Sequence, residues 1–308
     1  MLKIIKKIFN RLKRVWTIIR LSLSYFICKN DEKILLNVWI TSTTNGILHN
    51  NWGDDINYYF LSLLTNKKIY NYSDLSRLVI SKSTKNVLGI GSIIESHCNR
   101  NSIIWGSGAM YGGNIKLKEP PFLVKAVRGP LTKQYLTEQG IDCPDVFGDP
   151  ALLLPYFYKP YNTKKKYKLG IIPHYVDLQN ISTLRPISER ADCIKIIELK
   201  NYKSWTDIIE YIAECEFVIS SSLHGLIISD AFSVPNMWIK IGENIKGGNF
   251  KYLDYFESVG RSITEPLVIE NNLHFNDIMT FKDKWNPICF SPKKLLNACP
   301  FKKDDIKL

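Results

Sequence analysis

The stretch FVISSSLHGLIISDA, residues 217–231, decides the fold class of this 308-residue chain. Its beginning, Phe217–Ser220, is apolar and partly β-branched, which predicts a buried β-strand. From Gly225 to Phe232 the composition predicts a buried helix. A strand that passes through a short hydroxyl-rich turn into a helix is the repeating unit of an α/β fold with a parallel sheet.

The turn inside this stretch is the strongest candidate site. A helix N-terminus offers free backbone N–H groups and a partial positive charge, so it attracts phosphate. His224 at this turn can donate a proton or bind an anion near neutral pH. We therefore expect Ser221, Ser222, Leu223 and His224 to contact a substrate; the structural alternative for His224 is a hydrogen-bonded core histidine. His174 also ends a predicted strand and is a second candidate, with the same alternative.

Strands and helices alternate along two halves of the chain. Predicted strands are 34–40, 87–90, 102–105 and 122–127 in the first half, and 168–173, 193–199, 217–220 and 236–240 in the second; predicted helices are 55–64, 130–139, 204–215 and 225–232. This order predicts an α/β protein of two doubly wound, Rossmann-like domains that face a cleft. We expect domains over 34–155 and 168–308, joined by a Lys- and Pro-containing linker at 156–167.

Polar residues follow several strands of the first half. Gly53, Asp54 and Asp55 open a predicted helix, where an aspartate is either an N-cap or a base for a sugar hydroxyl. Arg128 ends a buried strand, and its planar guanidinium suits a carboxylate or phosphate, although a structural ion pair is the alternative. Asp149 lies in another strand-end turn and either binds hydroxyl groups or caps a helix.

Composition excludes several classes of protein. The seven cysteines are scattered without metal-ligand spacing, so we expect reduced thiols, no metal site and a cytoplasmic protein. No run approaches the roughly 20 apolar residues that span a bilayer. The formal net charge is +12, and most of it comes from residues 1–33, which hold nine Lys or Arg against Asp31 and Glu32. No nucleic-acid motif accompanies this charge, so we expect no nucleic-acid partner.

Residues 2–27 place apolar side chains three and four positions apart, which predicts an amphipathic helix. Seven Lys or Arg lie mostly on its other faces. This pattern favours a helix that lies on an anionic membrane surface, and residues 1–33 are assigned to it. The alternative is a helix packed on the domain with its charges solvated.

An ordered set of motifs resembles the polysaccharide pyruvyl transferase family, most closely the branch that acts on exopolysaccharides such as succinoglycan. The motifs are Gly53-Asp54-Asp55, Arg128-Gly129-Pro130-Leu131, Phe147-Gly148-Asp149-Pro150, Ile172-Pro173-His174-Tyr175, Ser222-Leu223-His224-Gly225 and the run 249–255. The resemblance covers roughly residues 50–262. It implies a fold similar to GT-B glycosyltransferases, with phosphoenolpyruvate between the domains and no cofactor. It also implies that Arg128 and His224 bind or protonate this donor.

The chain departs from the family pattern at Ser222, where many members carry arginine. Lys251, Arg261 or His174 would then supply the missing cation, or the donor binds more weakly. In the expected reaction His224 protonates the methylene carbon of phosphoenolpyruvate, and one sugar hydroxyl attacks with Asp55 as base. A second hydroxyl displaces phosphate and closes a ring ketal.

The expected acceptor is a sugar of a cell-surface polysaccharide or of its lipid-linked precursor, at the inner face of the cytoplasmic membrane. Two other functions remain open. A GT-B glycosyltransferase would share the two-domain cleft but use a nucleotide sugar. A catalytically inactive, membrane-docked scaffold for polysaccharide assembly would explain the departure at Ser222.

Overall fold

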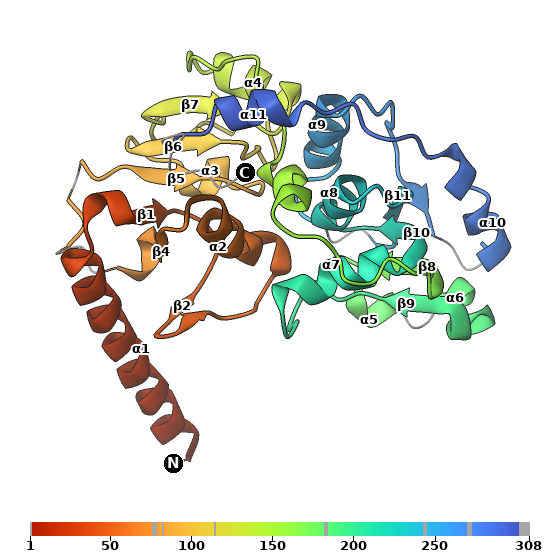
Figure 1. The fold of residues 1–308 in the computed structure, drawn as a ribbon, viewed down its shortest axis with the longest axis horizontal. Coiled ribbons are helices and arrows are strands. Elements are labelled where there is room, and N and C mark those ends of the chain that lie inside the picture. The colour runs from red at the N-terminus through yellow and green to blue at the C-terminus, as the bar shows by residue number, and fades with distance from the viewer. Residues whose placement is uncertain are drawn as a thin grey trace.

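The computed structural model describes residues 2–75, 79–81, 83–113, 115–181, 184–242, 245–269 and 273–301, and side chains from residue 5 onward. Two five-stranded sheets lie side by side, and all of their strand pairs are parallel (Figure 1). The prediction of two Rossmann-like α/β halves is therefore confirmed.

The first sheet has the order β4-β1-β5-β6-β7. Its strands are β1 (Lys33–Leu36), β4 (Lys68–Asn71), β5 (Asn86–Leu88), β6 (Ser102–Trp105) and β7 (Leu123–Ala126). The helices of this half are α2 (Trp52–Thr65), α3 (Ile94–His97) and α4 (Pro130–Thr137), and a short hairpin joins β2 (Ser42–Thr43) to β3 (Gly46–Ile47). Leu36, Leu88 and Ile104 of the strands are fully buried, as are Phe60 and Leu64 of α2. Apolar side chains on every central strand thus drive the packing of this half.

The second sheet has the order β12-β11-β10-β8-β9. Its strands are β8 (Tyr167–Ile172), β9 (Ile194–Ile196), β10 (Cys215–Ser220), β11 (Asn236–Lys240) and β12 (Leu267–Val268). Its helices are α5 (Leu178–Ile181), α6 (Arg185–Glu189), α7 (Trp205–Ala213), α8 (Leu223–Ala231), α9 (Phe250–Ser258) and α10 (Phe275–Met279). Ser204 begins α7 as the predicted cap, in a capping box with Asp207. Short 3-10 helices lie at Asn30–Glu32, Tyr72–Asp74, Pro150–Tyr156, Ala191–Cys193 and Lys282–Lys284.

The two halves share one apolar core, which contains side chains from both sheets. Polar contacts add to it: the Trp52 backbone N–H donates to the Leu199 carbonyl at 2.8 Å, and the Trp52 indole N–H donates to the Trp205 carbonyl at 2.7 Å. Both bonds hold the start of α2 against the second half. The segment predicted as a linker, residues 156–167, is tied to α7 because Glu210 accepts hydrogen bonds from Tyr158 and Tyr161.

The C-terminal part of the described chain contacts the first half of the protein. After α10 the chain returns to the first half, where α11 (Pro292–Asn297) packs close to β6 (Figure 1). The Trp105 indole N–H donates to the Leu295 carbonyl at 2.9 Å, and the ring of Phe301 packs edge-on against Trp105. The physical reason is that Trp105, which is fully buried, needs both a cover and a hydrogen-bond acceptor.

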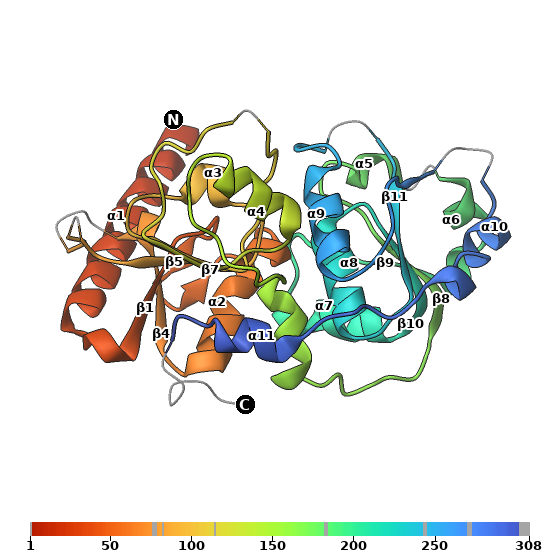
Figure 2. The ribbon, with the colours of Figure 1, turned by 90° about the horizontal axis from the view of Figure 1, so that it is seen from above.

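Helix α1 (Leu2–Ile27) is present as predicted. It extends away from the body of the protein in Figure 1, and Figure 2 shows it at the edge of the first half. Its C-terminal end is anchored, since Tyr25 and Cys28 are buried against Leu35, Tyr70 and Leu75 of the first half. Arg14 adds an ion pair with Asp74. Within the described residues no helix is long and apolar enough to cross a membrane.

Candidate active site

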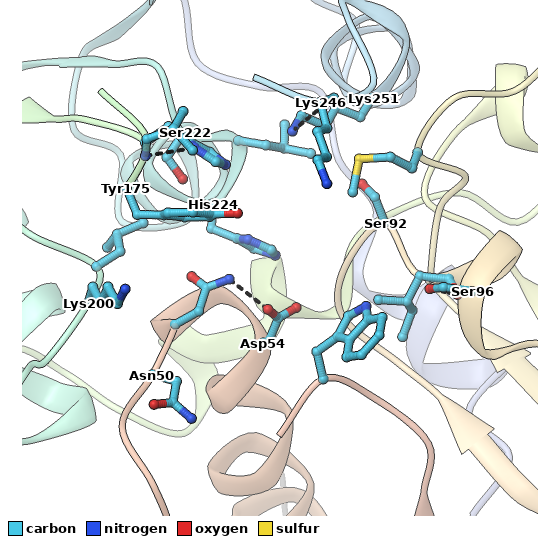
Figure 3. Close-up of a pocket in the computed structure, with 18 of the residues that line it drawn as sticks. Asn50, Asp54, Ser92, Ser96, Tyr175, Lys200, Ser222, His224, Lys246 and Lys251 are labelled. Carbon is cyan, nitrogen blue, oxygen red and sulfur yellow. Dashed lines mark hydrogen bonds between the residues drawn. The ribbon is translucent and has the colours of Figure 1, made fainter. Parts of the chain in front are cut away.

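A cavity of about 480 Å³ lies between the two halves and is lined by residues from both. Six of the residues predicted from the sequence reach its wall: Asp54, His174, Ser222, Leu223, His224 and Lys251. Figure 3 shows Asp54 near His224, with Lys251 and Lys246 on the side away from Lys200. Gly53, Asp55, Arg128, Asp149 and Ser221 lie behind this wall.

The N-terminus of α8 is one wall of the cavity. The Leu226 N–H is bonded to the Ser222 carbonyl at 3.3 Å, so the N–H groups of residues 223–225 have no acceptor within the helix. Ser222 is the N-cap residue, yet its side chain makes no capping hydrogen bond. This helix end therefore presents backbone donors and a partial positive charge to the cavity.

His224 lies in the first turn of α8, and its Nε2 atom is buried without a hydrogen-bond partner among the described residues. The pKa of His224 is lowered to about 3. Burial is the largest cause, and the nearby Arg128, Lys251 and His174 add to it. A pKa of about 3 corresponds to a neutral imidazole at pH 7. His224 lines the cavity and carries a buried nitrogen without a partner among the described residues, which supports the functional interpretation over that of a hydrogen-bonded core histidine.

Gly53, in the first turn of α2, determines how closely the two halves approach at His224. A Cβ atom at Gly53 would lie 2.0 Å from His224 Nδ1. The imidazole thus packs directly on the backbone of α2, and the N-terminal turns of α2 and α8 meet at this point. Gly53 is therefore a positioning residue that leaves room for the His224 ring. This role explains a glycine at position 53 even without contact to a substrate.

We expect Gly53→Ala to lower the turnover number more than it lowers stability. The added methyl group has to displace the His224 ring, and small displacements of a catalytic group reduce rates strongly, by about 10²-fold in typical cases. Steady-state kinetics together with thermal unfolding checks this prediction. Gly140→Ala is a control, because a Cβ there meets open space, although the positive φ of 75° adds a local strain of its own. An active Gly53→Ala enzyme would show that the His224 ring can move freely.

Asp54 and Asp55 have different environments although they are adjacent. Asp54 lines the cavity, and its Oδ2 accepts a hydrogen bond from the Asn51 side-chain amide at 2.6 Å. Burial raises the pKa of Asp54 to about 7, the Asn51 hydrogen bond and Lys251 oppose that rise, and the Asp55 charge adds to it. The Asp54 carboxyl is thus poised to exchange a proton near neutral pH.

Asp55 instead holds the turn before α2. Its Oδ2 accepts hydrogen bonds from the backbone N–H groups of Asn50 and Asn51, at 2.9 and 3.1 Å, and from the Tyr202 hydroxyl at 3.0 Å. The side chain is fully buried, and burial raises its pKa. The role of base that the sequence assigned to Asp55 thus fits Asp54 better, because only Asp54 faces the cavity.

Lys251 on α9 lines the same cavity. Its ammonium group is almost fully buried and donates to the Lys246 carbonyl at 3.3 Å. Burial, followed by the charge of Arg128, lowers the pKa of Lys251 to about 8, while Asp54 opposes the shift. His174 lies in the same wall, and burial, followed by Lys251, lowers its pKa to about 4.

Ser221 connects the segments that carry these groups. Its hydroxyl donates to Asp177 at 2.7 Å and accepts from the His174 backbone N–H at 2.9 Å. Its carbonyl accepts from the Tyr252 hydroxyl at 2.7 Å. Ser221 is therefore a positioning residue, and Ser222 is the hydroxyl residue at the cavity wall.

Arg128 is fully buried in an ion pair between the two halves. Its Nε atom donates to Asp254 on α9 at 2.9 Å, Nη2 donates to the Ala109 carbonyl at 2.7 Å, and Nη1 bonds to the Ser92 hydroxyl. Asp254 also accepts from the Thr132 N–H and hydroxyl, both at 2.7 Å. Of the two interpretations, the geometry favours the structural ion pair over direct ligand contact.

The two other predicted polar residues behind the wall are also engaged. Asp149 caps the 3-10 helix at Pro150–Tyr156 by accepting from the Ala151 N–H at 3.0 Å, and burial raises its pKa to about 6. Arg261 binds Asp230 and Asn236, at 2.8 and 2.9 Å. Neither side chain reaches the cavity.

Arg128→Lys is expected to destabilise the protein by about 1–3 kcal/mol, the typical cost of leaving a buried polar group without its hydrogen bond. A lysine ammonium has no planar fork to reach Asp254, Ser92 and Ala109 together. Denaturant unfolding measures the change, and Arg100→Lys, at an exposed ion pair with Glu119, is the control with little expected effect. If Arg128→Lys is fully stable and inactive, Arg128 acts on the donor after all.

Comparison with known proteins decides the family of the chain. The sequence model of the polysaccharide pyruvyl transferases matches residues 37–242, more than half of the chain. The chain belongs to the polysaccharide pyruvyl transferase family. A relative in Rhizobium meliloti (strain 1021), named succinoglycan biosynthesis protein ExoV, is 26% identical over 221 residues, covering 69% of this chain and 62% of that protein. The uncharacterized protein L143 of Acanthamoeba polyphaga mimivirus is 30% identical over 200 residues, covering 62% and 68%.

The lining of the cavity answers part of the question raised by the serine at position 222. Of the three residues expected to replace the missing arginine, Lys251 and His174 line the cavity, whereas Arg261 does not. The sequence analysis did not single out Glu95, Lys200 or Lys246, which also line it. Lys200 directly follows the predicted strand 193–199, and this position is a signal that could have identified it. Within the described part of the chain no group of His, Cys, Asp and Glu is arranged to hold a metal ion.

Proposed function

We propose that this protein is a ketal pyruvyl transferase that uses phosphoenolpyruvate as donor and releases phosphate. The acceptor is a sugar of a cell-surface polysaccharide or of its lipid-linked precursor. One observation carries the proposal: a cavity between the two halves brings the free N–H groups of α8, His224 and Lys251 together with Asp54. Membership in the polysaccharide pyruvyl transferase family supports this reaction, and the name of the succinoglycan biosynthesis relative supports a polysaccharide acceptor.

The donor carries a phosphate and a carboxylate, and the cavity wall offers matching groups. Backbone N–H groups at the start of α8 suit the phosphate. The side chains of Lys251 and His174, which line the same cavity, offer further hydrogen-bond donors to the donor's negative groups. Preorganised donors of this kind stabilise negative charge in a partly dry site at little reorganisation cost.

The chemistry needs one proton delivered to carbon and two taken from hydroxyl groups. A proton added to the methylene carbon of phosphoenolpyruvate leaves an oxocarbenium-like centre, which one sugar hydroxyl attacks as it loses its proton. A second hydroxyl then attacks the same carbon, its proton is removed, and the carbon–oxygen bond to phosphate breaks. His224 is the proposed acid. Burial is the main cause of its low pKa and neighbouring cations add to it, and the negative charge of the donor counters both the cations and part of the cost of charging the ring. Asp54 is the proposed base.

Activity is expected to fall on the alkaline side as Lys251 loses its proton. Its pKa of about 8 means that Lys251 is charged below that pH and neutral above it. Because kcat/KM reports the free enzyme, the value of kcat/KM for the donor should drop through pH 8. Arginine stays charged at this pH, so in Lys251→Arg the alkaline fall in kcat/KM should shift to a higher pH. An unchanged alkaline limb in this variant would remove Lys251 from donor binding.

The test of the proposed function is product analysis. The purified protein is incubated with phosphoenolpyruvate and with envelope oligosaccharide from cells that lack the gene. We expect free phosphate and a sugar whose mass has grown by pyruvate less one water. Release of a nucleotide from a nucleotide sugar would instead establish the glycosyltransferase, and donor binding without turnover would establish the inactive scaffold.

We also infer that α1 lies on the anionic inner face of the cytoplasmic membrane, which would bring the cavity to lipid-linked acceptors. The apolar side chains of α1 are exposed, among them Ile8, Phe9, Leu12 and Trp16, while a separate face packs on the body. An exposed apolar stripe flanked by cations matches a helix at a lipid surface.

A further inference from the structure

Three exposed aromatic side chains border the cavity. Trp39 and Tyr111 come from the first half and Tyr175 from the second, and they are 62%, 45% and 52% exposed. Single exposed aromatics are ordinary on a protein surface, but a group of them around one cavity marks a binding surface. None of the three is needed for the donor chemistry described above, which relies on charge and proton transfer.

The aromatic side chains from both halves are held in place by neighbours. The Trp39 ring packs at 84° against His97, with ring centres 4.4 Å apart. The Tyr175 ring packs against His174 with centres 4.4 Å apart, and Lys200 Nζ lies 5.7 Å from the Tyr175 ring centre. Figure 3 shows Lys200 and Tyr175 on the same side of the cavity. Aromatic side chains that are already fixed by their neighbours lose little conformational entropy when a ligand binds.

The loop that carries Tyr111 is fixed through Glu95. The Glu95 carboxylate accepts the backbone N–H groups of Met110, Tyr111 and Gly112, at 2.8, 2.9 and 3.3 Å. Gly112 has a φ of +62°, and a Cβ there would lie 2.2 Å from the Phe250 ring, so the loop packs tightly against α9. Glu95 therefore uses its charge to position Tyr111, and the carboxylate is not free for chemistry.

We propose that Trp39, Tyr111 and Tyr175 form the acceptor subsite, in which pyranose rings of the glycan stack on the aromatic faces. A pyranose ring has apolar C–H faces and a rim of hydroxyl groups. It fits aromatic faces that are interleaved with polar side chains, here Asn50 and Ser96 of the cavity wall. Because these aromatic side chains come from both halves of the protein, the subsite suits an acceptor of at least two sugar units. The role of this subsite as the acceptor site rests on the proposed function, whereas its binding of sugars does not.

The experiment measures sugar binding without turnover. Methyl β-galactoside, lactose and cellobiose are titrated at up to tens of millimolar into the full-length protein, and binding is followed by saturation-transfer NMR and by Trp fluorescence. We expect the disaccharides to bind more tightly than the monosaccharide. Trp39→Ala or Tyr175→Ala should each weaken disaccharide binding by about 3- to 10-fold, and Trp39→Phe should retain most of it.

Two controls make the result specific. Tyr156 is 57% exposed and lies away from the cavity wall, so Tyr156→Ala should leave sugar binding unchanged. Phosphoenolpyruvate should bind Trp39→Ala and Tyr175→Ala as it binds the wild type, which also shows that the variants fold. Phosphate release with a glycan acceptor should then show a raised acceptor KM and an unchanged donor KM.

Several outcomes overturn the subsite. These are a wild-type protein that binds none of the sugars, aromatic variants that bind them equally well, or a Trp39→Ala variant that loses only vesicle binding. The last result would make Trp39 a membrane contact. If sugars bind through the aromatic residues but no phosphate is released from phosphoenolpyruvate, the subsite stands and the pyruvyl transfer fails.

Discussion

His224→Gln is expected to reduce pyruvyl transfer by about 10²–10⁴-fold while the protein stays folded, as the loss of a general acid typically does. Glutamine is polar and of similar reach, but it cannot hold and deliver a proton. The ring packs against Gly53 and leaves its Nε2 atom without a partner, so its removal breaks no hydrogen bond of that atom within the described residues. The rate is measured as phosphate release, and thermal unfolding reports the fold.

His274→Gln is the matched control, because this exposed histidine pairs with Glu189 far from the cavity wall. A second measurement tests the proton itself. Burial and, after it, the neighbouring cations lower the pKa of His224 to about 3, and a bound anion reverses the influence of the cations. Donor binding at pH 7 should therefore take up protons, measured by calorimetry in buffers of different ionisation enthalpy. Equal proton uptake by His224→Gln, or near-normal turnover, would remove His224 from the mechanism.

The fold was predictable where apolar runs end in clear turns. Strands β6 and β11 have the predicted bounds, Ser102–Trp105 and Asn236–Lys240. The edge strands β4 and β12 were missed, since Lys68–Asn71 is short and half polar and Leu267–Val268 has only two residues. Such strands form because a neighbouring strand supplies hydrogen bonds, and a local pattern does not carry that information.

The sequence predicted which turns form the site, but it did not predict which side chain of each turn faces the cavity. Asp54 and Asp55 are adjacent on a helix, where successive side chains point about 100° apart. One faces the cavity while the other bonds to Asn50, Asn51 and Tyr202, and the sequence alone cannot tell which. Arg128 shows the same limit, because its partner Asp254 is 126 residues away in the chain.

Leu12→Asp is expected to weaken binding to anionic vesicles by about 10²-fold, since burial of a leucine contributes about 1.5–3 kcal/mol and each charge near the surface about 1 kcal/mol. Leu12 is exposed on α1, away from the face that packs through Tyr25 and Cys28. Sedimentation with phosphatidylglycerol vesicles measures the change. Val268→Asp adds the same charge at an exposed aliphatic residue outside α1, and it should bind as the wild type does.

A substitution is a better test than removal of residues 1–30, which would take Tyr25 and Cys28 out of a buried cluster and expose Leu35 and Tyr70. Salt should weaken vesicle binding of the wild type without eliminating it, because charge attraction is screened and apolar insertion is not. Turnover on a short soluble acceptor should be the same for Leu12→Asp and the wild type, since α1 does not line the cavity. If Leu12→Asp still binds vesicles fully, or if it unfolds, the exposed face of α1 serves a protein contact and the membrane assignment is wrong.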